Sequence, residues 1–253
     1  MTEEQQFLFD LNGFLIIEDV LTLAECEDLK KQIYLIKFDS EKLPAEHREI
    51  PGGHFASLID HPKVEPILKK ILGLNIRLDH GFVIWRKQGE RHPADLHHGG
   101  PTPEPMFRYH FRGEKMFSGL LRVVFELNDV GPEDGGTCFI PGSHKSNFHV
   151  PKSMISLKNE EMSPAIYKSS CKAGSVIIFT ENVAHGGPEW NSPDKPRVSV
   201  FYSYNHLGMQ FHKPIFSPEI INTLTTNQQS YFRNTWIYDF ENDQPNGNIN
   251  YSV

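Results

Sequence analysis

Two stretches far apart in the chain alternate residue by residue, and this alternation constrains the fold more than any other feature. Successive side chains of a β-strand point to opposite faces, so a period of two predicts strands over residues 119–129 and 197–205. The apolar faces consist of Leu121, Val123, Phe125 and Leu127 in the first strand and Val198, Val200, Tyr202 and Tyr204 in the second. The opposite faces carry Arg122, Glu126, Arg197 and Ser199. We therefore expect two strands that present charged side chains to an enclosed interior.

Helical patterns flank these strands in the sequence. Thr22, followed by Glu25 three places later, forms a capping box, and apolar residues then recur at helical spacing, which predicts a helix over residues 23–36. The same spacing predicts helices over residues 63–72 and 218–232. Shorter apolar runs predict further strands at residues 11–20, 76–87, 137–140 and 175–180.

Helices first and many short strands later are typical of a mainly β domain with flanking helices. We expect a jelly-roll (cupin-like) core over about residues 74–206, with a helical N-terminal part at 1–73 and a C-terminal helix and tail at 207–253. No repeat or linker interrupts the 253 residues, so a single domain is expected. The connection at 39–61 is long for an ordinary loop, and this segment and the C-terminal helix are candidates for covering a site.

Composition narrows the class of protein. A formal charge of −7 and a pI near 6.0 argue against a partner that is a nucleic-acid polymer. The three cysteines have no paired spacing, which fits a reducing compartment, and the chain begins with acidic and polar residues unlike a secretory signal. No apolar run reaches the roughly 18 residues that a membrane helix needs. These features predict a cytoplasmic protein without membrane contact, and they leave its oligomeric state open.

Two histidines carry the predicted chemistry. His97 is followed two places later by Gly99, and His185 lies far downstream, before Arg197. Side chains from distant strands of a β-barrel converge on one cavity, and a buried guanidinium pairs well with a carboxylate. Two imidazoles and such an arginine predict Fe(II) held by His97 and His185, with Arg197 and Ser199 holding the far carboxylate of 2-oxoglutarate.

The position of the first ligand has two alternatives. His98 is also followed by glycine two places later, and Asp95 could supply a carboxylate ahead of His97. We prefer His97, because Gly100 and the following proline then remain free to form a turn.

Residues 15–26, 134–145 and 173–197 resemble the phytanoyl-CoA dioxygenase family, and the resemblance spans roughly residues 10–206. It implies a double-stranded β-helix, an Fe(II) centre, 2-oxoglutarate and O₂. It also implies that His97 and His185 are the proximal and distal iron ligands and that Arg197 is the cosubstrate clamp.

The chain departs from that family at Gly99, where the family has aspartate or glutamate. The same exchange characterises iron-dependent halogenases that resemble this superfamily, in which chloride fills the vacated position. The resemblance therefore implies a halogenase, with Gly99 as a catalytic position and chloride as a further cofactor.

The substrate is expected to be a small molecule that carries a phosphate or carboxylate, such as a nucleotide. The segment between Trp85 and Lys115 is net basic, and its candidate substrate-binding residues are Arg86, Arg108 and Arg112. Arg122 points to the predicted interior, where it should reach an anion: cosubstrate, halide or substrate. Two rival functions remain: a hydroxylase in which water fills the position at Gly99, and a non-catalytic jelly-roll protein or zinc cupin.

Overall fold

Two antiparallel sheets form the core of the protein, whose structure is a computed structural model that describes residues 1–102 and 104–235. The larger sheet has the strand order β1-β8-β5-β10-β2, and the smaller sheet has the order β7-β6-β9. The strands of the larger sheet are β1 (Phe14–Ile17), β8 (Val176–Thr180), β5 (Leu121–Glu126), β10 (Arg197–His206) and β2 (Ile76–Arg86). Those of the smaller sheet are β7 (Tyr167–Lys168), β6 (Cys138–Ile140) and β9 (Ala184–Gly186), and a separate hairpin consists of β3 (His110–Arg112) and β4 (Lys115–Phe117).

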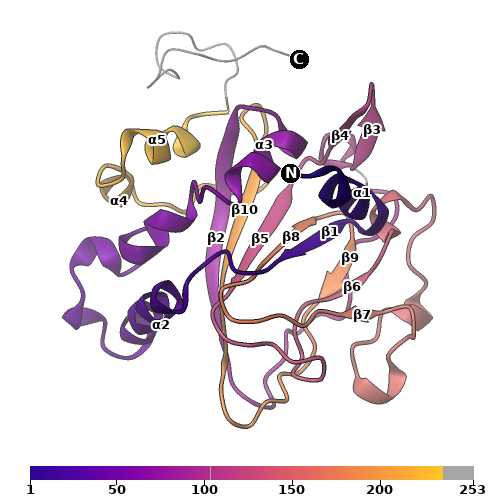
Figure 1. Ribbon diagram of the computed structural model, residues 1–253, viewed down its shortest axis with the longest axis horizontal. Helices are drawn as coiled ribbons and strands as arrows, with labels where there is room; N and C mark the ends of the chain where they lie inside the picture. The colour runs from indigo at the N-terminus through magenta and orange to yellow at the C-terminus, as the bar shows by residue number, and fades with distance from the viewer. Residues whose placement is uncertain (103, 236–253) are drawn as a thin grey trace.

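Helices cover the outer face of the larger sheet. They are α1 (Glu3–Asn12), α2 (Leu23–Phe38), α3 (Glu65–Leu72), α4 (Pro218–Ile221) and α5 (Thr226–Gln229). Figure 1 shows α2, α4 and α5 on one side of this sheet and the smaller sheet on the other. The apolar faces predicted for residues 119–129 and 197–205 pack into this outer core, so the predicted alternation is confirmed.

The inner faces of the two sheets enclose the site. A second apolar cluster fills the space between them and consists of Phe14, Val124, Phe139, Ile177, Phe179, Val183 and Phe201. Charged residues share this inner face, because β5 and β10 pair so that Ser199 lies opposite Glu126 and Ser203 lies opposite Arg122. The predicted mainly β fold with a jelly-roll core and helical buttresses is confirmed.

The strand predicted over residues 11–20 is shorter in the structure, where β1 spans Phe14–Ile17. Residues 11 and 12 were predicted to begin a strand, but they end helix α1, and β1 begins only at Phe14. The break falls at Gly13, whose φ of 84° is left-handed and caps the helix. The polar, weakly amphipathic start of the chain carried too little periodicity to predict α1.

The predicted helix over 218–232 is broken. Thr225 has an extended backbone and its side chain accepts a hydrogen bond from the Gln228 amide, so a new helix starts there. Short 3₁₀ helices lie at Ser40–Lys42, Ala45–His47, Gly53–Leu58, Pro105–Phe107, Ser143–Lys145, Lys152–Met154, Asn159–Glu161 and Ser230–Phe232. The predicted tail from Glu241 lies outside the described residues.

The two segments predicted to cover a site, residues 39–61 and the C-terminal helix, do not lie between the two sheets. Tyr202 and Tyr204 donate hydrogen bonds from the outer face of β10 to the carbonyls of Phe55 and Ile59, at 3.0 and 2.9 Å. Gln228 of α5 donates to the Ala56 carbonyl. The segment 39–61 and the C-terminal helices therefore buttress the sheet from outside. Within the described part of the chain, no helix has the length and apolar character needed to cross a bilayer.

Candidate metal and cosubstrate site

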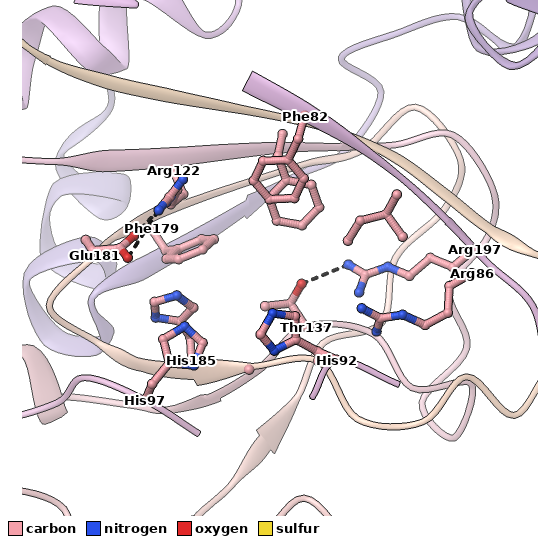
Figure 2. A pocket seen from close by; sticks show the side chains of 14 residues that line it. Phe82, Arg86, His92, His97, Arg122, Thr137, Phe179, Glu181, His185 and Arg197 are labelled. Atoms are coloured by element: carbon pink, nitrogen blue, oxygen red, sulfur yellow. Dashed lines mark hydrogen bonds and ion pairs between the residues drawn. The ribbon is translucent and has the colours of Figure 1, made fainter. Parts of the chain in front are cut away.

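A cavity of about 190 Å³ opens between the two sheets. Its walls come from the inner faces of β2, β5, β8, β9 and β10, and Figure 2 shows His97 and His185 at one end and Arg86 and Arg197 at the other. The lining residues are Phe82, Ile84, Arg86, His92, His97, Arg122, Thr137, Phe179, Glu181, His185, Gly186, Gly187, Arg197 and Phe201. The structure thus brings together His97, His185, Arg122, Arg197 and Arg86, all predicted site residues.

His97 and His185 are held side by side by the backbone. Their amides and carbonyls form a reciprocal β-bridge at 3.1 Å, and their ring centroids lie 4.3 Å apart. Nδ1 of His185 lies 2.7 Å from the Val183 carbonyl, and Nδ1 of His97 lies 3.2 Å from the Asp95 carbonyl. Because a carbonyl only accepts, each Nδ1 carries the proton and donates it. Each Nε2 then keeps a lone pair, which is the arrangement of a metal-binding histidine.

Burial keeps both imidazoles neutral. It lowers the pKa of His185 to about 3, although the carboxylate of Glu181 opposes the shift. Burial likewise lowers the pKa of His97. A neutral imidazole is the form that binds a metal ion, so both rings are ready to act as ligands near neutral pH.

His98 also turns toward this end of the cavity. Its φ of 61° is left-handed, and its ring centroid lies 5.1 Å from that of His97 and 5.5 Å from that of His185. Its Nε2 lies 3.2 Å from a carboxylate oxygen of Glu181. Both candidate histidines thus stand beside His185; His97 lines the cavity, whereas the His98 side chain is 39% exposed. The third candidate, the Asp95 carboxylate, pairs with Arg91 and does not line the cavity.

Glu181 is a buried carboxylate that is not among the site residues predicted from the sequence. Arg122 donates to it from Nε at 2.6 Å and from Nη2 at 3.3 Å, and Arg122 also donates to the Ser203 hydroxyl. Burial raises the pKa of Glu181, but the charge of Arg122 and the hydrogen bond to His98 outweigh burial and hold that pKa well below its ordinary value. The one available signal was its position on the same turn as His185, four residues earlier.

Gly99 does not line the cavity. A Cβ built on it would stand 2.8 Å from the Cβ of Ala184 and 2.8 Å from Cγ2 of Val150, and its φ of 80° is left-handed. The glycine therefore meets a backbone and packing requirement at this tight turn. The direction of its missing side chain leads into packed apolar atoms.

Arg197 is already paired with a carboxylate of the chain. Its Nη2 and Nε donate to the two oxygens of Glu126, and Nη2 also donates to the Thr137 hydroxyl at 2.8 Å. Ser199 donates to the same Glu126 carboxylate at 2.7 Å. The side chains of Arg197 and Glu126 are each 1% exposed. The two residues predicted to hold the cosubstrate thus hold Glu126.

Arg86 stands beside this pair, and within residues 1–102 and 104–235 it has no carboxylate at ion-pair distance. It pairs in register with Arg197 across β2 and β10, and its side chain donates a hydrogen bond to the Pro188 carbonyl at 3.3 Å. Burial and the positive charge of Arg197 lower the pKa of Arg86 to about 10. The other two predicted substrate residues, Arg108 and Arg112, are exposed and do not line the cavity.

The donor chemistry of the imidazole end fits Fe(II). Within the described ranges, no three His, Cys, Asp or Glu side chains already converge as a metal cluster. Two neutral imidazoles with free Nε2 atoms and a nearby buried carboxylate are nevertheless the donors that non-haem iron sites use. His97 and His185 are the residues that would hold the metal, with His98 and Glu181 beside them.

Solved structures share this fold. HygX from Streptomyces hygroscopicus with nickel and 2-oxoglutarate bound superposes with a TM-score of 0.72 at 18% identity, over 87% of this chain and 94% of that one. The same protein with nickel, 2-oxoglutarate and hygromycin B bound gives a TM-score of 0.69 at 19% identity, over 87% and 94%.

Sequence comparison gives the family. An ectoine dioxygenase from Sphingopyxis alaskensis is 22% identical over 242 residues, covering 85% of this chain and 79% of the relative. An ectoine dioxygenase from Nocardia farcinica is 22% identical over 262 residues, covering 85% and 81%. The family model described as phytanoyl-CoA dioxygenase (PhyH) matches residues 9–199. The chain therefore belongs to the phytanoyl-CoA dioxygenase family of Fe(II)- and 2-oxoglutarate-dependent dioxygenases.

Proposed function

We propose that the protein is an Fe(II)- and 2-oxoglutarate-dependent hydroxylase of a small polar molecule. The observation that supports this best is the carboxylate of Glu181, buried beside His97, His98 and His185. It places a carboxylate, which Arg122 also contacts, at the imidazole end of the cavity. When bound, iron, 2-oxoglutarate and O₂ supply the two-electron oxidation of a C–H bond, with succinate and CO₂ as coproducts.

The chain's own residues prepare the cavity for this chemistry. The carbonyls of Asp95 and Val183 hold the protons of the two imidazoles away from the metal position. Phe82 and Phe201 stack with centroids 4.6 Å apart and form an apolar wall, together with Phe179. Such walls exclude water and strengthen the electrostatic interactions inside. Arg86 supplies a positive charge at the far end.

A small polar substrate is consistent with the relatives. Two of them are named ectoine dioxygenases, and one structure of HygX holds hygromycin B. Arg108 and Arg112 lie outside the cavity, so the proposed substrate needs no large anionic group for recognition by them. The nucleotide-like substrate expected from the basic segment is therefore the weaker of the two substrate proposals.

The test is turnover of purified, iron-loaded protein with 2-oxoglutarate in the presence and absence of O₂. Succinate should form only with O₂, and a substrate panel of amino acids, polyols, aminoglycosides and nucleotides should yield a product heavier by one oxygen. Protein that neither binds Fe(II) nor forms succinate would favour a non-catalytic jelly-roll protein instead.

Halogenation is the second candidate, and it rests on the sequence pattern alone, in which glycine stands two residues after His97. Reactions with chloride, with bromide and without halide separate the two functions by product mass. Hydroxylation predicts one product in all three reactions. Halogenation predicts a chlorinated or brominated product in the first two.

Gly99→Asp and Gly99→Ala form a matched pair for the same question. Both variants introduce a Cβ against Ala184 and Val150, but only aspartate adds a carboxylate. If chloride binds beside residue 99, halogenation should survive alanine better than aspartate. If the glycine serves packing, both variants should lose stability and activity together.

A further inference from the structure

Two buried arginines, Arg86 and Arg197, line the cavity, and among the residues that the structure describes only Arg197 has a carboxylate partner. We infer that Arg86, and not Arg197, binds the distal carboxylate of 2-oxoglutarate. The inference rests on the proposed function, because it assigns a residue to the cosubstrate of that same site. It also differs from the expectation drawn from the sequence, which gave this role to Arg197.

The first step concerns Arg197. Its Nε and Nη2 groups are both engaged with Glu126, and Thr137 accepts a further hydrogen bond from Nη2. A second carboxylate bound there would lie against the Glu126 carboxylate in a buried environment, where like charges repel strongly. Ser199, the other predicted clamp residue, donates its proton to Glu126 as well. Arg197 therefore acts as a structural partner of Glu126.

The second step concerns Arg86. The residue is 8% exposed, yet it has no carboxylate within ion-pair distance in the part of the chain that is described. With the described residues its side chain forms one hydrogen bond, from Nη1 to the Pro188 carbonyl at 3.3 Å. A buried guanidinium without an anion is unfavourable, and its remaining N–H groups form a fork that suits a carboxylate.

The third step concerns the space in which this guanidinium lies. A Cβ on Gly187 would stand 2.9 Å from Nη1 of Arg86 and 3.5 Å from Nη2. The backbone of Gly187 is not left-handed, so its conformation does not require glycine. The missing side chain leaves room for the Arg86 guanidinium.

The fourth step is the direction of Arg86 relative to the imidazoles. Figure 2 shows Arg86 and Arg197 reaching into the cavity from the end opposite His97 and His185, with Thr137 between them. A dicarboxylate whose 2-oxo acid end lies at the imidazoles would direct its other carboxylate to this end. The hydroxyl of Thr137 accepts from Arg197, which leaves its proton available for the same carboxylate.

The test compares two 2-oxo acids of equal carbon number. Wild type, Arg86→Gln and Arg48→Gln are loaded with Fe(II) without O₂ and titrated by calorimetry with 2-oxoglutarate and with 2-oxopentanoate, which lacks the distal carboxylate. Arg86→Gln should raise the Kd of 2-oxoglutarate by about 10- to 100-fold, the loss expected for hydrogen bonds to a charged group. The Kd of 2-oxopentanoate should not change. The exposed Arg48 is the control, and its substitution should change neither value.

Gly187→Ala gives a second measurement that keeps both arginines. Its Cβ displaces the Arg86 guanidinium, so it should weaken 2-oxoglutarate and spare 2-oxopentanoate. This variant also keeps the inference testable if Arg86→Gln does not fold. Unchanged 2-oxoglutarate binding in both variants would overturn the role of Arg86, as would wild type that binds the two acids equally. Wild type that binds neither acid would overturn the proposed function itself.

Discussion

Arg197 and Glu126 face each other from the neighbouring strands β10 and β5, and each side chain is 1% exposed. Desolvation of two buried charges is unfavourable, and their mutual attraction offsets it only when the remaining donors and acceptors are satisfied. Thr137 and Ser199 satisfy them here. The pair therefore holds β5, β10 and the turn before β6 in register while remaining neutral as a unit.

Substitution of one partner should be far more harmful than substitution of both. Arg197→Met leaves the Glu126 carboxylate buried and unpaired, and we expect it to lower the free energy of unfolding by about 3–5 kcal/mol. The double variant Arg197→Met/Glu126→Leu should recover much of that loss. Urea unfolding of the two variants and wild type measures the difference. Equal losses in the single and the double variant would show that the paired charge is not the cause.

Glu181 should contribute to metal affinity. Glu181→Gln removes the negative charge beside the imidazoles and the carboxylate partner of Arg122 and His98, so Fe(II) affinity should fall by about 10- to 100-fold. Anaerobic calorimetric titration with Fe(II) measures the Kd of the metal in the variant and in wild type. Glu133→Gln is the matched control, because Glu133 is exposed and pairs with Lys168 on the surface. Wild-type affinity in Glu181→Gln would remove this residue from the metal environment.

Some of this site could be predicted from the sequence, and some could not. Histidine and arginine at family positions predicted that His97, His185 and Arg197 share one cavity, and the structure places them together. The partners of the charged groups were not predicted, because pairing depends on strand register. Glu126 and Arg122 were both visible on the inner face of one strand, but only the strand order brings Glu126 to Arg197 and Arg122 to Glu181.

At the scale of elements, alternation predicted strands well and periodicity predicted helix α2 well. Both patterns are local and strong there, since the sheet has one face against helices and the other against the cavity. The helix α1 and the break in the C-terminal helix were missed. The break in the C-terminal helix is due to a short capping motif: Thr225 and Gln228 form a capping box inside a stretch of otherwise helical spacing.

Helix α2 offers a test of the same capping chemistry. The Thr22 side chain accepts a hydrogen bond from the Glu25 amide, and the Glu25 carboxylate accepts one from the Thr22 amide. Thr22→Ala removes the first of these, so it should lower the free energy of unfolding by about 1 kcal/mol. Thr22→Ser keeps the hydroxyl and should stay near wild type. Urea unfolding measures both variants, and equal loss in serine and alanine would assign the effect to the lost methyl group.

At the scale of the molecule, the interior is rich in neutral histidines. Burial is the largest cause in each case: it lowers the pKa of His144 to about 4 and also lowers the pKa values of His61, His80 and His206. His144 is 1% exposed, and its Nε2 lies 3.1 Å from the Asp10 carbonyl. These groups lie apart from the candidate metal ligands, so their titration acts on stability without passing through the iron site.

The direction of the resulting pH dependence follows from proton binding. An unfolded chain protonates histidine below about pH 6.5, whereas folded His144 stays neutral down to about pH 4, so the unfolded state binds more protons in that window. The contribution of His144 to the free energy of unfolding is therefore fully present above about pH 6.5. It falls as the pH drops toward 4, by up to about 3 kcal/mol. Urea unfolding of metal-free protein at several pH values should show this fall. His144→Gln should flatten it, whereas His54→Gln, at an exposed position, should leave it unchanged. The same slope in all three proteins would show that folding does not lower the pKa of His144.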